Sequence, residues 1–366
     1  MTTREQIFSC PSMPTPDAGN IPATSVKVFV IDDEASVCGA LRESFATSGE
    51  CVLVGEATCA SDAQTRVGEA APDVILLRDD LPGMSGLQLT RALMLRRPVP
   101  IIIMADLNGA DCDTAFECLR SGALDIISRD SKDLASSETI SRITAIARGA
   151  GKRSSEDDRA DTQTITVLHQ AGLLVLVAGK GALNSALRLL SSDVLPSALP
   201  VLLAVDFAPS LFGAFVTWLD ETLEQGARKV NLTTAAPLIA GGVNVANAAS
   251  MPRLVTGENG SVCVAGMPDL PAGLAPASMG SSAFDILLMS APPEMAKALL
   301  VVLFGHMGKG GAAGLLAVRR AGGQTLLEQP PFCPFATSAQ VALMTEAGQG
   351  VGSVAELAAM ISTEGR

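Results

Sequence analysis

The sequence has few of the groups with which proteins bind nucleic acid. Among its 366 residues there is no tyrosine and one tryptophan, and aromatic residues make up 3% of the total. Because exposed bases stack on aromatic side chains, this scarcity argues against a single-stranded nucleic-acid site. Lys and Arg number 26 against 38 Asp and Glu, which gives a net charge of −12. Phosphate binding depends on clustered basic side chains, so the charge balance also argues against a nucleic-acid partner.

Long hydrophobic runs are absent as well. Residues 173–178 and 298–304 are among the longest apolar runs, and both are far shorter than the about 18–20 residues needed to span a bilayer. The first residues are polar and proline-rich and lack the apolar core of a signal peptide. We therefore expect a cytoplasmic protein with no membrane insertion.

Metal and disulfide motifs are missing too. The eight cysteines form no C-x-x-C pair and no zinc-type spacing with the two histidines. Several of them lie in apolar stretches, where cysteine behaves as a small hydrophobic residue. We expect reduced thiols, no metal and no cofactor.

The length of the chain predicts two domains. Residues 1–25 contain several prolines and predict a disordered leader. Residues 149–163 combine glycine, serine and charged residues with almost nothing apolar, which is typical of a linker. The expected domains are therefore residues 26–148 and 164–366.

Short apolar runs alternate with helix-forming segments in both halves. Strands are expected in the first half at residues 26–31, 52–57, 74–77, 101–104 and 125–127. In the second half they are expected at residues 164–178, 201–205, 238–246, 262–264, 286–289, 299–304 and 325–327. Runs this short and apolar are typical of strands buried on both faces, so each half predicts an α/β fold with a doubly wound parallel sheet.

Four segments of the first half resemble the response-regulator receiver domain, which has a flavodoxin-like fold. They are VFVIDDE (28–34), PDVILL (72–77), LPGMSGL (81–87) and SGALDII (121–127). The resemblance implies a site in which carboxylates hold Mg²⁺, a central Asp takes a phosphoryl group, and a hydroxyl and a Lys bind its oxygens. Only an anionic oxygen can form such an acyl phosphate.

The receiver positions are only partly retained. Asp32 and Asp33 match the metal-binding pair, whereas Arg78 stands where the phospho-acceptor is expected. Ala105 occupies the hydroxyl position and Arg129 the Lys position. Arginine cannot accept phosphate, so we predict that Arg78 replaces Mg²⁺ as the cation beside the acidic pair.

Two neighbouring carboxylates could be proposed as substitute acceptors. Asp79 should point to the opposite face of the strand, because successive side chains alternate. Asp80 lies one step further into the loop. Neither is expected to accept phosphate.

The second half resembles the catalytic domain of CheB-type protein-glutamate methylesterases, a three-layer α/β fold. The matching segments are residues 174–190, 200–220, 238–246, 282–291 and, most strongly, 301–329. The resemblance implies a Ser–His–Asp triad that hydrolyses methyl esters or deamidates glutamine on chemoreceptors. In such a triad His deprotonates Ser, and Asp orients the imidazole.

None of the three triad positions is retained. The glycine turn AGKGAL (178–183) places Lys180 or Gly179 at the Ser position, depending on the gap. Asp206 falls on the His position and Gly310 on the Asp position. We therefore predict an inactive site, in which Lys180 and Asp206 could form an ion pair.

A rebuilt site has two sets of candidate residues. His306 could be a remnant base, although a loop histidine satisfied by backbone is the simpler interpretation. A pair of Lys180 with Ser185 is disfavoured, because Ser185 belongs to the following helix.

Two modules that lack their reactive residues indicate a regulatory or scaffolding protein in bacterial chemotaxis or two-component signalling. Its expected partner is a protein, either a chemoreceptor or another signalling protein. The alternative is a divergent protein-glutamate methylesterase or protein-glutamine glutaminase with a relocated active site.

Overall fold

The computed structural model describes residues 25–96, 99–107, 112–150, 171–192, 195, 197–267, 282–330, 333 and 335–362. The chain divides into two compact units, residues 1–151 and 152–366. The predicted leader, apart from its last residue, and nearly all of the predicted linker lie outside the described residues.

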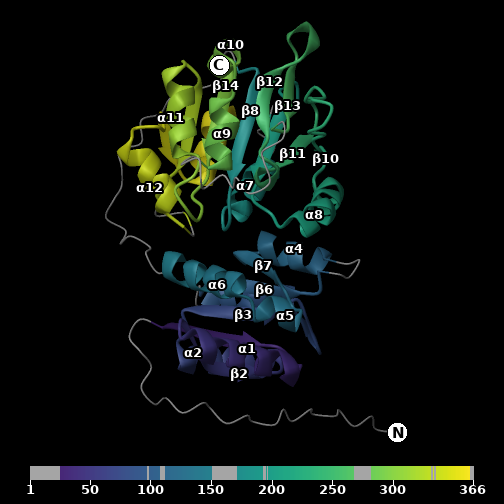
Figure 1. Cartoon of the computed structure of the whole chain (residues 1–366), viewed down its shortest axis with the longest axis vertical. Helices are drawn as coiled ribbons and strands as arrows, with labels where there is room; N and C mark the ends of the chain where they lie inside the picture. Colours follow the sequence, from purple (N-terminus) through teal and green to yellow (C-terminus); the bar gives the residue numbers. More distant parts are fainter. Residues whose placement is uncertain are drawn as a thin grey trace. The chain divides into compact units, whose positions relative to one another are not determined.

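The first unit is built on a five-stranded parallel sheet with the order β2-β1-β3-β6-β7 (Figure 1). The strands are β1 (Val26–Ile31), β2 (Cys51–Ala57), β3 (Val74–Arg78), β6 (Ile101–Ala105) and β7 (Asp125–Ser128). A small antiparallel pair, β4 (Asp80–Leu81) and β5 (Met84–Ser85), follows β3.

Helices pack against this sheet. They are α1 (Ala35–Ser48), α2 (Ala60–Ala70), α3 (Gly86–Arg96), α4 (Asp113–Arg120), α5 (Ser131–Leu134) and α6 (Ser137–Ala150). α1 packs with α5 and α6, whereas α3 packs with α4. The central strands are almost completely buried because helices cover them, as in other parallel sheets.

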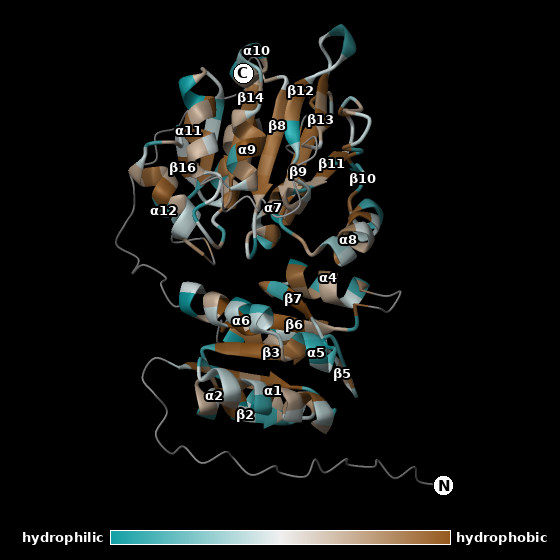
Figure 2. Ribbon diagram, in the orientation of Figure 1, coloured by the Kyte–Doolittle hydropathy of each residue, from teal (hydrophilic) through white to brown (hydrophobic). Residues whose placement is uncertain are grey.

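The second unit contains a seven-stranded parallel sheet with the order β10-β11-β9-β8-β14-β15-β16. Its strands are β8 (Leu173–Ala178), β9 (Val201–Val205), β10 (Ala227–Lys229), β11 (Val243–Asn247), β14 (Leu299–Leu303), β15 (Gln324–Glu328) and β16 (Gly350–Gly352). A separate antiparallel pair is formed by β12 (Arg253–Thr256) and β13 (Val262–Ala265). Figure 2 shows that the long central strands are hydrophobic along their length.

The helices of the second unit are α7 (Leu183–Leu190), α8 (Pro209–Thr222), α9 (Ala283–Met289), α10 (Pro293–Lys297), α11 (Ala312–Arg320), α12 (Thr337–Met344) and α13 (Val354–Ser362). Short 3₁₀ turns lie at η1 (Ala248–Ser250) and η2 (Glu258–Gly260). β8 pairs with β9 on one side and with β14 on the other. The chain thus adds strands first on one side of β8 and later on the other, which makes β8 a switch point of the sheet. In open parallel sheets, such a switch point places a crevice at the carboxyl ends of the strands.

The predicted fold class, two α/β units with parallel sheets, is confirmed. Of the predicted strand 164–178, residues 164–170 lie outside the described residues and Leu173–Ala178 form β8. Two other predicted strands are wrong in detail. Residues 286–289 belong to helix α9, because Ser282 and Asp285 form a capping box that starts a helix there. A short apolar run cannot by itself distinguish a strand from a buried helix. Of residues 238–246, only those from Val243 onward are in β11, since Gly241 adopts a φ of 76° and interrupts the run.

Candidate functional site

In the first unit, the sequence-predicted residues meet at the carboxyl ends of the parallel strands. Asp32 and Asp33 follow β1, Arg78 ends β3, Ala105 ends β6, and Arg129 follows β7. Because these strands are neighbours, the fold brings the five residues to one edge of the sheet.

Arg129 binds the buried carboxylate of Asp32 through two hydrogen bonds. Its Nη2 lies 2.7 Å from Asp32 Oδ1, and its Nε lies 2.8 Å from Asp32 Oδ2. Nη1 also donates to Glu34 Oε1 at 3.0 Å. Asp32 is fully buried, and these hydrogen bonds raise the pKa of the Arg129 guanidinium above its ordinary value. From the sequence, Arg129 was predicted only to occupy the Lys position. Glu34 was not predicted to be part of this cluster.

Arg78 forms the second ion pair of this cluster. Its Nη1 contacts Asp33 Oδ1 and lies 3.7 Å from Glu34 Oε1. Two guanidinium groups therefore neutralise most of the charge of three carboxylates. Ala105 is buried and presents only a methyl group, so it offers no hydroxyl.

Asp79 lies on a different side from Arg78. It is near Cys118 of α4, whose pKa is raised to about 12, mainly by burial and further by the charge of Asp79. Burial also raises the pKa of the Asp79 carboxyl. Asp80 is exposed in the β4–β5 hairpin.

In the second unit, a pocket of about 360 Å³ opens at the carboxyl ends of β8, β9 and β14, and we call it the carboxyl-end pocket. It lies at the switch point of the sheet. The lining residues that matter chemically are Gly179, Asp206, Ser282, Phe284, His306 and Gly310. The fold thus gathers Asp206, His306, Gly310 and the glycine turn at one place. Lys180 does not line this pocket.

His306 is buried in the wall of the carboxyl-end pocket, with 1% of its surface exposed. Its Nδ1 lies 2.9 Å from the Phe304 carbonyl oxygen. A carbonyl can only accept, so Nδ1 carries the proton and Nε2 presents a lone pair. Nε2 is buried and has no hydrogen-bond partner among the described residues. Burial lowers the pKa of the imidazole and keeps it neutral, although the Asp206 and Asp285 charges oppose this shift.

Gly179 and His306 fit together as a pair. A Cβ atom at position 179 would lie 2.5 Å from His306 Cδ2 and 2.8 Å from Cγ, closer than real contacts allow. The imidazole therefore occupies the space that a side chain at position 179 would need.

Gly310 and Ser282 form a similar pair. A Cβ atom at position 310 would lie 2.6 Å from Ser282 Oγ. Ser282 Oγ donates to Asp285 Oδ2 at 2.7 Å and accepts from the Gly311 amide at 3.2 Å. Neither Ser282, which lines the pocket, nor its partner Asp285 was expected at this site from the sequence. Their S-x-x-D spacing before an apolar run was the signal that could have identified the cap.

The expected ion pair between Lys180 and Asp206 does not form. Neither side chain takes part in an ion pair with any residue that the structure describes. The reason is positional: Asp206 lines the carboxyl-end pocket, whereas Lys180 does not. The Lys180 backbone carbonyl accepts from Met307 N at 3.0 Å.

Ser185 is engaged elsewhere, as its place in α7 predicted. Its Oγ donates to Glu328 Oε1 at 2.7 Å in the buried interior. The other carboxylate oxygen of Glu328 accepts from the Gly305 amide at 2.9 Å. Burial raises the pKa of Glu328 above its ordinary value near 4.5, and the hydrogen bonds from Ser185 and Gly305 oppose that shift.

We expect Glu328→Gln to remove part of the pH dependence of stability. Where the folded pKa is raised, the folded state keeps a proton that the unfolded chain has released. Stability due to Glu328 is therefore complete below about pH 4.5 and is lost as the pH rises through the folded pKa, by at most about 1.4 kcal/mol per pH unit. Glutamine does not titrate; its amide oxygen can accept from the Gly305 amide, and its amide N–H can donate to Ser185 Oγ. Urea unfolding followed by the buried Trp218 should thus give a flatter pH profile for the variant.

The matched control for this prediction is Glu294→Gln. The Glu294 side chain is 86% exposed and pairs only with Lys297 at the surface. Its replacement should leave the pH profile unchanged. Identical profiles for wild type and Glu328→Gln would contradict the assignment of a raised pKa to Glu328.

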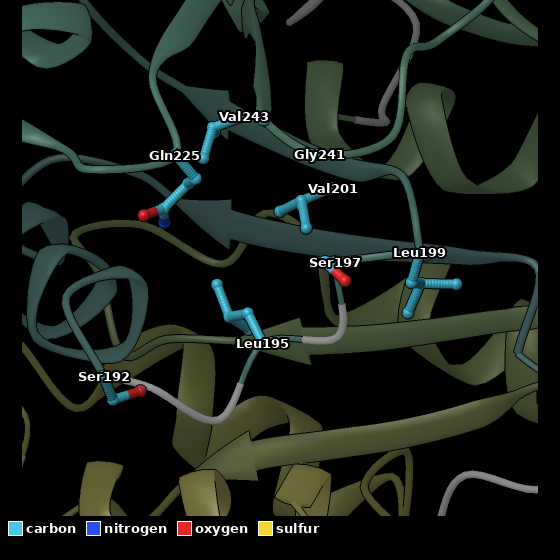
Figure 3. A pocket seen from close by; sticks show the side chains of 9 residues that line it. Ser192, Leu195, Ser197, Leu199, Val201, Gln225, Gly241 and Val243 are labelled. Carbon is cyan, nitrogen blue, oxygen red and sulfur yellow. The ribbon is translucent and has the colours of Figure 1, made fainter.

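A second pocket in this unit lies at the opposite end of the sheet (Figure 3). Its volume is about 220 Å³, and it is lined by Val201 and Val243, which begin β9 and β11. Gln225 also lines it, but its Nε2 already donates to the Leu190 carbonyl at 2.9 Å. Because ligands of parallel sheets bind at the carboxyl ends, this amino-end pocket is not our candidate site.

Two features are absent from the described residues. No helix among them is both long and apolar enough to cross a membrane. No group of three or more His, Cys, Asp or Glu side chains among them could hold a metal ion.

Two family models match the chain. The response regulator receiver domain matches residues 28–143, and CheB methylesterase matches residues 174–361. Among similar proteins is protein-glutamate methylesterase/protein-glutamine glutaminase 2 of Cereibacter sphaeroides, which is 29% identical over 82% of this chain and 82% of its own length. A protein of the same name from Burkholderia thailandensis is 27% identical over 84% of this chain and 90% of its own length.

Solved structures of Thermotoga maritima proteins are also similar. The CheB methylesterase catalytic domain is 19% identical and covers 52% of this chain and 97% of its own, with a TM-score of 0.44. The response regulator domain of CheB is 24% identical and covers 34% of this chain and 97% of its own, with a TM-score of 0.31. From the two family matches, the chain belongs to the CheB methylesterase family of chemotaxis response regulators, with a receiver domain preceding the methylesterase domain.

Proposed function

We propose that this protein is a catalytically silent member of its family that acts as a regulatory or scaffolding protein in bacterial chemotaxis or two-component signalling. Its partner is a protein, either a chemoreceptor or another signalling protein, and it works in the cytoplasm. Each domain keeps its fold and contributes a binding surface in place of a reaction.

The contact between Gly179 and His306 carries this proposal. A triad needs a nucleophile hydroxyl within hydrogen-bond reach of the base. The turn at residues 179–181 reads Gly-Lys-Gly and has no hydroxyl. At position 179 the imidazole fills the space that a nucleophile's Cβ would need. The Ser282 hydroxyl gives its proton to Asp285, so it is not activated by His306.

The receiver domain supports the proposal independently. Arg129 and Arg78 bind the carboxylates that would hold Mg²⁺. We propose that these two guanidinium groups take the place of the metal and hold the domain in a single state. The positions assigned to the phospho-acceptor and the hydroxyl, Arg78 and Ala105, have no oxygen to offer.

The test of the methylesterase domain is methanol release from a methylated chemoreceptor. We expect no release above background from the full chain, while an active methylesterase of the family releases methanol under the same conditions. Methanol-releasing activity that copurifies with the protein would contradict the proposal.

The alternative is a divergent protein-glutamate methylesterase or glutaminase with a relocated site. One observation favours it: Ser282, His306 and Asp206 line the same pocket. If methanol or ammonia were released, loss of turnover in both Ser282→Ala and His306→Ala would assign the reaction to these residues.

The receiver domain gives a separate prediction. Incubation with acetyl phosphate and Mg²⁺ should leave no acid-labile phosphate on the protein, because Arg78 cannot form an acyl phosphate. Mass spectrometry of the intact chain at neutral pH measures this directly, with an ordinary receiver domain as positive control. A phosphorylated species that disappears in Asp80→Asn or Asp79→Asn would reveal a substitute acceptor and contradict the prediction.

A further inference from the structure

The carboxyl-end pocket has an unusual balance of hydrogen-bonding groups. His306 Nε2 presents a lone pair, is buried and has no partner within the described part of the chain. Buried polar atoms of side chains nearly always have a partner in native proteins. An acceptor left open in a pocket wall indicates that the pocket receives a donor.

Other acceptors line the same pocket. The Asp206 carboxylate and the Gly310 backbone both line it, as His306 does. The Asp206 charge and the Gly310 carbonyl are close enough to His306 to favour the protonated imidazole, although burial dominates and keeps it neutral. An acceptor atom of the ring thus faces a region rich in other acceptors.

Three donors near this pocket are already occupied: the Ser282 hydroxyl and the Gly311 and Gly314 amides. Ser282 Oγ gives its only proton to Asp285. At the start of α11, the Gly311 and Gly314 amides donate to Ser282 Oγ and to Asp285 Oδ1. Lys309 is the cation of the lining, and it is exposed. These three donors are not available to an anionic ligand, whereas a cationic group would find His306 Nε2 and the Asp206 carboxylate as acceptors.

We propose that the carboxyl-end pocket binds the guanidinium group of an arginine side chain presented by the partner protein. One N–H of the guanidinium donates to His306 Nε2 and others donate to the Asp206 carboxylate. A planar fork of several donors suits two separate acceptors, which a neutral carboxamide cannot match. The inference rests on the proposed function in one respect, that the pocket receives a partner and not a substrate for hydrolysis.

The experiment uses the full chain labelled with ¹⁵N-histidine. The sequence has two histidines, so the ring signals are few, and a His169→Gln variant assigns those of His306. N-acetyl-arginine methylamide is titrated against N-acetyl-citrulline methylamide, its neutral isostere. We expect the arginine probe to shift the Nε2 resonance of His306 as the lone pair gains a donor. The citrulline probe should bind at least about tenfold more weakly, because it lacks the charge.

Variants locate the binding site. Asp206→Asn should weaken binding of the arginine probe at least about tenfold, because a charge-assisted hydrogen bond is lost. Lys309→Gln should strengthen binding, because it removes a like charge from the lining. Lys297→Gln is the matched control, since Lys297 is exposed on α10 and does not line the pocket. Unchanged Trp218 emission verifies that each variant is folded.

Three results would overturn the inference: no shift of the His306 signal with the arginine probe, equal affinity for arginine and citrulline probes, or no effect of Asp206→Asn. The methanol assay is independent of all three. Methanol release would refute the proposed lack of catalytic activity but would not change the result of the arginine titration. A failed titration would refute arginine binding but not the lack of catalytic activity.

Discussion

Replacing Gly179 by alanine is expected to destabilise the methylesterase domain by about 1–3 kcal/mol, the usual cost of overpacking. The added Cβ would lie 2.5 Å from His306 Cδ2. Gly179 is not among the residues with positive φ, so the alanine backbone itself is unstrained and the cost comes from the imidazole. Because Trp218 is the only tryptophan and lies in this domain, its fluorescence during urea unfolding measures the loss.

A double-mutant cycle with His306→Ala isolates that contact. Removing the imidazole alone leaves a cavity and should also destabilise the domain. In the His306→Ala background, however, Gly179→Ala should cost much less than in wild type, since the space is then free. Gly213→Ala is the control, because Gly213 is a helical glycine with no atom near its missing Cβ, and it should be neutral or slightly stabilising. Additive effects at positions 179 and 306 would contradict the assigned contact.

The second large effect is expected at Arg129. Arg129→Ala removes the partner of the fully buried Asp32 carboxylate and leaves that charge uncompensated. Breaking a buried ion pair on one side costs about 3–5 kcal/mol. Arg129 keeps 15% of its side-chain surface exposed, so we expect a value near the lower limit, about 3 kcal/mol. Hydrogen exchange of the β1 and β3 amides measures the stability of the receiver domain separately from Trp218.

Two comparisons make this prediction specific. Arg120→Ala should cost less than about 0.5 kcal/mol, because its pair with Glu117 is an exposed contact between residues one helical turn apart. Adding Asp32→Asn to Arg129→Ala should restore much of the loss, since the buried charge is then gone. If Mg²⁺ stabilises the Arg129→Ala variant and not the wild-type chain, the guanidinium groups of Arg78 and Arg129 occupy the place where a metal would bind. An Arg129→Ala variant as stable as Arg120→Ala would refute the neutralising role.

The positions of the acidic pair and of Arg78 were predictable because they depend on strand order alone. Parallel neighbours end at one edge, so residues that follow β1, β3 and β7 must lie together. The partner choices were not predictable. Arg78 was expected to neutralise the whole pair, yet it contacts Asp33, whereas Arg129 takes Asp32. Which long side chain reaches which carboxylate depends on loop geometry, and strand order does not specify it.

In the second domain, some features were predictable from the sequence and others depended on tertiary contacts. The missing hydroxyl of the glycine turn and the residues Asp206 and Gly310 could be read from the sequence. The expected ion pair of Lys180 with Asp206 was wrong, because sequence position does not tell which side of a turn a side chain takes. The helix at Ala283–Met289 was missed because its apolar run fits a strand equally well.

By itself, the sequence determined the fold class, the family resemblance and which side-chain groups are present at the strand ends. Those features depend on apolar periodicity and on which side-chain atoms exist at all. Only the tertiary structure decided why Gly179 and Gly310 must be glycines and why His306 Nε2 has no partner in the described part of the chain. The reason is physical: a glycine that is required by packing, or an acceptor that is left open, is defined by atoms from distant segments, and these meet only when the sheet has formed.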